Sequence, residues 1–421
     1  MAKIDFSHFR SRGFRFYLGT RFLMTFAIQM QNVITGWFLY SLTNDPLTLG
    51  IVGLAEAMPA ILFALFAGNL VDKFDKRKIL MITFSLYGVC TLGFAWAASH
   101  FAVNMLSVNQ IVWCFYIILF CLGLARSFAG PASFSALGYL FPKSMMTKVT
   151  PISSTAWQLG AIFGPAAGGF IYAFTTPAIS SLIVTFFIIL SVISASRLPA
   201  MPVIPEAVSG EAGLTERIKE GLRYVFKHKV ILSSISLDLF AVLFGGAVAL
   251  LPVFAKDILH VGATELGWLR AAPSAGAAIV LLFMSVKPPE HHTGWILLIA
   301  VAGFGLCMIG FANSTHLWLS LFLLFASGAF DAVSVVIRGT ILQIFTPDRM
   351  KGRVAAVNTI FIGSSNEIGA FESGAAARWL GTVPSVNAGA AITILVVITT
   401  AIIAPQLRNL ELKTIEPDQD D

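Results

Sequence analysis

Twelve apolar runs constrain this chain more than any other feature of its sequence. A helix needs about 20 apolar residues to cross the hydrocarbon core of a bilayer, because it rises about 1.5 Å per residue. Each run is long enough, and short connections separate most of them. The predicted spans are residues 14–41, 47–71, 79–99, 108–138, 148–173, 177–197, 230–254, 264–286, 294–313, 316–345, 353–381 and 384–406. The predicted fold class is an all-α membrane protein with twelve transmembrane helices.

The basic residues lie mostly on one side of the predicted bilayer. If the N-terminus is cytoplasmic, 22 of the 28 Lys and Arg residues fall in cytoplasmic segments, and the opposite loops hold only Lys256. Cytoplasmic loops carry the excess of Lys and Arg in membrane proteins. We therefore expect a multi-pass protein of the bacterial inner membrane with both termini in the cytoplasm. Topology and anionic lipid account for the net charge of +6, so no nucleic-acid partner is expected.

The composition excludes a soluble protein and gives no sign of an enzyme. Only 12% of the residues are charged, against about a quarter in soluble domains. The first run is too long for a signal-peptide core and lacks a cleavage site, so it is predicted to be a retained helix. The sequence has no catalytic triad pattern, phosphate-binding loop or metal-ligand spacing. We expect no cofactor and no metal, and energy must come from an ion gradient.

One polar segment, residues 198–229, divides the spans six and six. Within it, residues 214–226 place apolar side chains at helical spacing, with charged residues on the other face. We predict an amphipathic helix on the cytoplasmic membrane surface. The predicted organisation is an N-terminal six-helix half (1–197), a cytoplasmic linker (198–229), and a C-terminal six-helix half with its tail (230–421).

The loop between the second and third spans carries a dense charge motif. Gly68, Asp72 and Arg77 stand in the pattern Gly-x-x-x-Asp-x-x-x-Lys-Arg-Lys. Asp72 is at the C-terminal end of a helix, where the macrodipole disfavours a carboxylate unless basic neighbours compensate. The pattern resembles the loop signature of the major facilitator superfamily of secondary transporters. The resemblance implies two six-helix halves and a cytoplasmic latch at Gly68, Asp72 and Arg77.

The fifth span carries glycines that permit close helix packing. Gly160, Gly164 and Gly168 are four apart and so lie on one helix face, while Pro165 removes one helical hydrogen bond. With Gly169, these residues resemble the antiporter signature of proton-coupled drug exporters. The resemblance implies that they seal the fifth span against the eighth, which offers small residues over 271–278. It favours export over import, and we assign the five residues to the conformational latch.

Four longer sequence segments, called phrases here, narrow the resemblance to one branch of the superfamily. They occupy residues 125–132, 251–262, 266–273 and 363–374. These phrases are similar to those of the transmembrane secretion effector group, which includes enterobactin-exporter-like proteins. The resemblance covers roughly residues 14–406.

Charged residues inside the spans are the candidates for proton coupling, because an ionisable group in hydrocarbon is costly and usually functional. Burial raises the pKa of a carboxyl group and a nearby guanidinium lowers it, so a conformational change can load and unload a proton. We rank Asp238 first and Glu367 second. The full set of candidates is Asp238, Glu367, Arg126, Asp331, Arg338 and Glu56.

Three of these assignments have alternatives. Asp331 and Arg338 are two helical turns apart and can form a static network within one helix. Glu56 precedes Pro59 and can serve the helix structurally. Arg126 can snorkel to the cytoplasmic surface; the resemblance instead implies that it tunes a nearby carboxylate.

Polar stripes on two spans predict the substrate-binding surface. Thr25, Gln29, Asn32 and Gly36 share one face of the first span, and buried amides need polar surroundings. We expect spans one, four, seven, ten and eleven to surround a central cavity, where such transporters bind substrate. The predicted substrate-binding residues are Gln29, Asn32, Asn358, Asn366 and Phe240.

The sequence thus predicts a monomeric secondary transporter that exports an amphipathic small molecule, such as a drug or siderophore-like metabolite, in exchange for protons. The coupling ion can also be sodium. An importer or facilitator of a metabolite is the alternative within transport. A membrane sensor or assembly factor that has lost transport is the alternative of another class.

Overall fold

The computed structural model describes residues 12–141, 145–201, 214–286, 289, 291–347 and 350–411. Every regular element in these ranges is helical, which confirms the predicted all-α class. Twelve of the described helices have 17 residues or more. They are α1 (Arg12–Thr43), α2 (Pro46–Lys73), α3 (Lys76–Ala97), α5 (Val108–Leu140), α6 (Met146–Phe174), α7 (Pro177–Ser196), α9 (Lys229–Gly245), α11 (Ala263–Val286), α12 (Thr293–Ala312), α13 (Leu317–Ile344), α14 (Lys351–Leu380) and α15 (Thr382–Ile403).

The helix lengths suit a bilayer. Ten stretches of the described chain are both long and apolar enough to cross a membrane. The other two long helices, α6 and α14, have 29 and 30 residues and pack against α1 and α9. The twelve predicted spans therefore correspond to the twelve long helices, with ends shifted by a few residues.

The seventh span differs from its prediction as one helix over 230–254. After α9 the chain continues as the 3-10 helix η4 (Val248–Leu250), the single turn α10 (Leu251–Val253) and the π-helix η5 (Phe254–Ile258). Gly245 and Gly246 end the regular helix, because glycine is the residue least costly to take out of helical geometry. Pro252 then supplies no backbone donor. The seventh span is therefore broken near its middle and is not the single helix that the sequence predicts.

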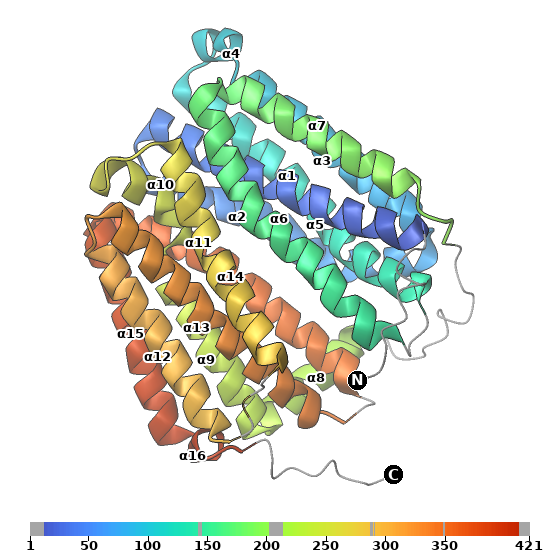
Figure 1. Cartoon of the computed structure of the whole chain (residues 1–421), viewed down its shortest axis with the longest axis vertical. Coiled ribbons are helices and arrows are strands. Elements are labelled where there is room, and N and C mark those ends of the chain that lie inside the picture. The colour runs from blue at the N-terminus through green and yellow to red at the C-terminus, as the bar shows by residue number, and fades with distance from the viewer. Residues whose placement is uncertain are drawn as a thin grey trace. The chain divides into compact units, whose positions relative to one another are not determined.

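Contacts divide the chain into two compact units. Unit 1 contains residues 1–44, 55–210 and 261–271, and unit 2 contains residues 45–54, 211–260 and 272–421. In unit 1, α1 packs against α6 and α7, and α3 packs against α5 and α7. Figure 1 shows α3 and α7 running side by side. The predicted boundaries of the two halves, 1–197 and 230–421, stay a prediction.

Unit 2 repeats this packing pattern with the helices that come six spans later. The first helix of its set, α9, packs against α14 and α15, while α12 packs against α13 and α15. The same partner positions are therefore used in both units. Such an internal repeat is expected of secondary transporters.

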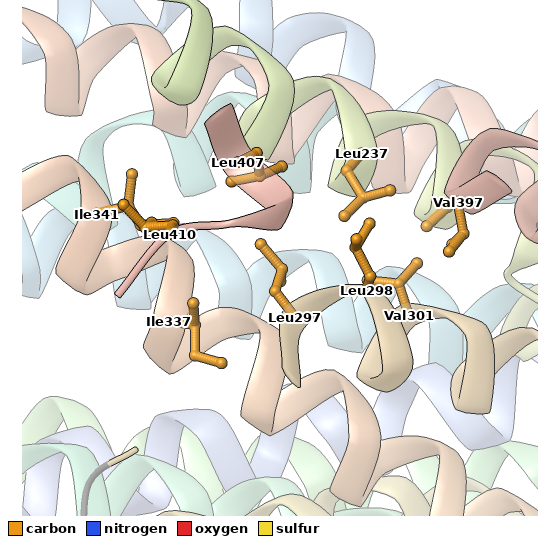
Figure 2. Packing of buried hydrophobic residues seen from close by; sticks show 10 residues of the cluster. Leu237, Leu297, Leu298, Val301, Ile337, Ile341, Val397, Leu407 and Leu410 are labelled. Atoms are coloured by element: carbon orange, nitrogen blue, oxygen red, sulfur yellow. The ribbon is translucent and has the colours of Figure 1, made fainter. Parts of the chain in front are cut away.

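The core of unit 2 gathers leucine, isoleucine and valine side chains from α9, α12, α13 and α15. Figure 2 shows Leu237, Leu298 and Val301 close together, with Val397 beside them. The short helix α16 (Pro405–Arg408) adds Leu407, which is fully buried. Burying one such side chain contributes about 1.5–3 kcal/mol where water is the alternative.

The predicted amphipathic helix is α8 (Leu214–Lys227), and Leu222 and Val225 on its apolar face pack on protein. Val225 is fully buried in a cluster with α9 and α14 residues. The Tyr224 hydroxyl donates to the Phe345 carbonyl oxygen at 2.7 Å, and burial raises the pKa of this tyrosine. Glu220 pairs with Arg353 at the start of α14. These contacts hold α8 against α9 and α14. The sequence instead predicts that this helix lies on the membrane surface.

Helices α11 and α13 of unit 2 touch backbone to backbone at Gly328. A methyl group there would overlap the carbonyl oxygen of Pro273. Overpacking costs about 1–3 kcal/mol, more than the roughly 1 kcal/mol by which alanine favours a helix. We expect Gly328→Ala to lower the midpoint of thermal unfolding in detergent. Gly339→Ala on the same helix meets open space and is the matched control, expected to leave the midpoint unchanged or raise it.

Candidate functional site

A buried ion pair joins α9 to α13 in unit 2. Arg338 Nη1 lies 2.5 Å from Asp238 Oδ2, and each residue is 5% exposed. Arg338 Nε also donates to the Ser334 hydroxyl, at 3.1 Å. Removing two charges from water is expensive, and only close geometry with further hydrogen bonds offsets the cost. Asp238, the residue ranked first for proton carriage, therefore has a guanidinium as its direct partner.

Asp331 lies two turns before Arg338 on α13. The carboxylate partner of Arg338 is Asp238 rather than Asp331, so the pairing is between helices and not within one. The charges of Asp238 and Arg338 nonetheless act on Asp331, which is half-buried. Two carboxyl groups and one guanidinium thus interact electrostatically, and only Asp238 contacts Arg338 directly. The group of three is electrically neutral when it holds one proton.

The break in α9 lies close to this group. Ser373 of α14 donates its hydroxyl to the carbonyl oxygen of Gly246, at 3.0 Å. A small pocket opens beside the break, lined by Phe244, Gly245, Gly246, Glu372, Ser373, Ser385 and Val386. Phe240 and Phe244 stack in parallel one turn apart, with ring centroids 6.4 Å apart. The Ser373 hydroxyl therefore supplies a donor to the Gly246 carbonyl oxygen, where the regular helix ends.

A second ion pair joins α2 to α5 in unit 1. Arg126 Nη1 lies 3.1 Å from Glu56 Oε1, with the side chains 51% and 16% exposed. Gly123, one turn before Arg126, allows the close approach, because a methyl group there would overlap the Glu56 carbonyl oxygen. The structure identifies Glu56 as the carboxylate beside Arg126.

A small pocket in unit 1 reaches Glu56 from α1. Its polar lining is Gln31, Asn32, Thr35, Glu56, Tyr87 and Thr91. The Gln31 amide nitrogen donates to Thr35 at 3.1 Å, but its oxygen accepts nothing from any described residue although it is buried. A buried acceptor without a donor is costly, so a water or a ligand group is expected beside it.

Arg270 of α11 also belongs to this site. Its Nη1 donates to the Asn32 carbonyl oxygen at 3.4 Å, and the charge of Glu56 acts on it. The Asn32 amide in turn donates to Gln29 Oε1 at 3.1 Å. The predicted stripe of α1 therefore meets a guanidinium. No role was predicted for Arg270, Gln31 or Tyr87. Of the three, only Arg270 carries a sign of function in the sequence, because it is a charged residue within a predicted span.

The predicted polar surface of α14 is only partly concealed. Asn358 is half-buried, while Asn366 is exposed and donates to the Ile362 carbonyl oxygen at 2.9 Å. Glu367 is half-buried on the same helix, and its carboxylate lies near Gly53 of α2. The structure does not bring Glu367 into the Asp238–Arg338 pair. Its role stays a prediction.

The glycine motif of α6 meets two helices, α1 and α11, and α11 is the predicted eighth span. Gly160, Gly164 and Gly168 face α1, where methyl groups would approach Thr25, Gln29 and the Met30 backbone within 3 Å. Gly169 instead meets Gly267 of α11, and the Pro165 carbonyl oxygen approaches the same Gly267. Within unit 2, Gly276 of α11 packs on α13. Four-residue spacing defines the face but not the helix that covers it.

The charged loop after α2 is anchored by Asp75 and Arg77. Asp75 caps α3 by accepting from the Arg77 backbone at 2.9 Å, and its other oxygen accepts from the Met201 backbone at 3.3 Å. Arg77 Nη2 donates to the Ser196 carbonyl oxygen at the end of α7, at 2.5 Å. Gly68 and Asp72 lie in the last turns of α2, and their side chains are outside the described part of the structure.

Comparisons with known proteins agree over nearly the whole chain. The family model for transmembrane secretion effectors matches residues 4–420. The multidrug efflux pump Tap of Mycobacterium tuberculosis (strain ATCC 25618 / H37Rv) is 25% identical over 380 residues, covering 85% of this chain and 86% of that protein. The enterobactin exporter EntS of Escherichia coli O9:H4 (strain HS) is 21% identical over 397 residues, covering 94% and 92%.

Solved transporter structures share the fold. The nucleoside transporter NupG superposes with a TM-score of 0.74 at 12% identity, covering 93% of this chain and 99% of that one. A D-xylose–proton symporter superposes with a TM-score of 0.72 at 15% identity, covering 95% and 99%. At such identities the likeness concerns the fold alone.

Proposed function

The chain belongs to the transmembrane secretion effector family of the major facilitator superfamily and is a transporter, not an enzyme, and we propose that it exports amphipathic small molecules in exchange for protons. Tap is named a multidrug efflux pump and EntS an enterobactin exporter. These names favour a drug-like or siderophore-like substrate. We place the protein in a bacterial inner membrane as a monomer with cytoplasmic termini, consistent with its basic loops.

The observation that carries the proposal is the Asp238–Arg338 pair with Asp331 beside it. A proton that binds Asp238 removes its charge and frees Arg338, which can then turn to Asp331. The link between α9 and α13 is thereby weakened without leaving a guanidinium alone in a low-dielectric interior. Proton binding thus becomes a change in helix packing.

The broken α9 supplies a place for that change to act. Gly245 and Gly246 absorb backbone rotation easily, and a single hydrogen bond from Ser373 holds the break. Once the ion pair opens, we infer that α9 swings about this point and the substrate site changes the side to which it opens. Glu367 is the second candidate carrier, and Asn358 and Phe240 are proposed to contact substrate.

Glu56 and Arg126 are proposed to act as a second titrating pair, on the evidence of their contact at 3.1 Å. The latch function of the charged loop is proposed for Asp75 and Arg77 together with Gly68 and Asp72. We propose that the glycine motif seals α6 against α1 and, at Gly169, against α11.

Reconstituted liposomes test the proposal. With the liposome interior held acidic, an antiporter is expected to accumulate an amphipathic fluorescent dye against its gradient. A protonophore should abolish the accumulation, whereas an equal sodium gradient without a pH difference should not support it. Accumulation driven by sodium alone, or dye movement that ignores both gradients, would contradict proton antiport.

A further inference from the structure

The two units carry opposite charge inside their spans. Within the membrane-spanning helices, the charged residues at least six positions from either end of their helix are three arginines and one acid in unit 1, against one arginine and four acids in unit 2. Those of unit 1 are Arg21, Arg126, Arg270 and Glu56; those of unit 2 are Asp238, Asp331, Glu367, Glu372 and Arg338. A guanidinium in hydrocarbon needs a partner.

In unit 1 one arginine already has its carboxylate. Glu56 accepts from Arg126 at 3.1 Å and is the single acid among these interior charges of unit 1. Arg270 has no carboxylate within ion-pairing distance in the described chain, and its one hydrogen bond there, to the Asn32 carbonyl oxygen, is long at 3.4 Å. Arg270 is therefore the arginine of this site that has no directly paired carboxylate.

The surroundings of Arg270 suit a ligand that accepts hydrogen bonds. Asn32 and Gln29 place amide groups on the adjacent face of α1. A cation would meet the guanidinium of Arg270, which has no directly paired carboxylate, and would be repelled by it. An anionic group restores neutrality and accepts the planar donors of arginine, which are suited to carboxylate geometry.

We propose that Arg270, together with the amides of Gln29 and Asn32, forms a subsite for an anionic oxygen group, such as a carboxylate or a phenolate, on the transported molecule. The inference rests on the proposed function, and it names the substrate class: amphipathic organic acids. Asp238 and Asp331 of unit 2 then carry the proton. The groups that bind the substrate and the groups that carry the proton therefore belong to different units.

Three probes with one fluorophore test the subsite on the purified full-length protein in chloride-free detergent buffer. Dansyl-norleucine carries a carboxylate, its methyl ester is neutral, and dansylcadaverine carries an ammonium group. We expect dansyl-norleucine to bind at least tenfold more tightly than either of the others. Arg270→Gln should weaken dansyl-norleucine at least tenfold and leave the ester unchanged, while Arg270→Lys should retain most of the affinity.

A matched control is Arg378→Gln, because Arg378 already pairs with Asp45 at 3.2 Å in unit 2. It should leave binding of all three probes unchanged. Equal affinities for acid and ester, tightest binding of the ammonium probe, or equal weakening of acid and ester by Arg270→Gln would each overturn the inference. Binding is measured without any gradient, so charge selection can hold even where proton-driven accumulation fails, and the reverse.

Discussion

Asp238→Asn is expected to abolish pH-driven dye accumulation while leaving dye binding intact. Asparagine resembles the protonated acid in shape but cannot exchange a proton, so the cycle loses its driving step. The substitution also leaves Arg338 buried at 5% exposure without its carboxylate. Removing one partner of a buried pair costs about 3–5 kcal/mol, so the thermal unfolding midpoint should fall as well.

The double variant Asp238→Asn/Arg338→Gln separates these two effects. It removes the unpaired guanidinium, so most of the lost stability should return, while accumulation should remain absent. The difference between double and single variants measures the interaction energy of the pair. If the double variant recovers pH-driven accumulation, the pair serves stability alone and the coupling assignment is wrong.

The second large effect is expected for Gly123→Ala on α5. Its new methyl group would overlap the Glu56 carbonyl oxygen, a backbone atom that cannot move aside cheaply. Helices α2 and α5 must separate, which displaces Glu56 from Arg126. We expect the unfolding midpoint to fall and transport to drop to a small fraction of the wild-type rate at equal protein density.

Gly130→Ala is the matched control on the same helix, since a methyl group there meets open space. It should behave as wild type in both measurements. Glu56→Gln tests whether the loss arises through the ion pair, because it removes the charge without overlap. Wild-type transport and stability in Gly123→Ala would show that α2 and α5 do not pack as described.

Local features of the sequence predicted the helices well because apolar length is a local property. The prediction of 177–197 became α7 over residues 177–196, with Thr176 capping the first turn and Pro177 at its start. The amphipathic period of residues 214–226 likewise became α8. Both follow from neighbours in sequence, as helix caps and helical periods do.

Partners distant in sequence could not be predicted in this way. Arg338 lies nearer to Asp331 in sequence, yet it pairs with Asp238, 100 positions away, because α9 and α13 pack together. The glycines of α6 identified a packing face, but only tertiary structure shows that α1 covers it. Arg270 received no role because its surroundings combine α1 and α11, which are far apart in the chain.

The central claim is that protonation of Asp238 is exchanged for movement of cargo. Simultaneous recording of dye and proton movement tests it most directly, with pyranine inside proteoliposomes reporting internal pH. Wild-type protein is predicted to release protons from the acidic interior as dye enters, and the Asp238→Asn/Arg338→Gln variant to release none. Dye accumulation without proton movement, or proton release by that variant equal to wild type, would contradict the account.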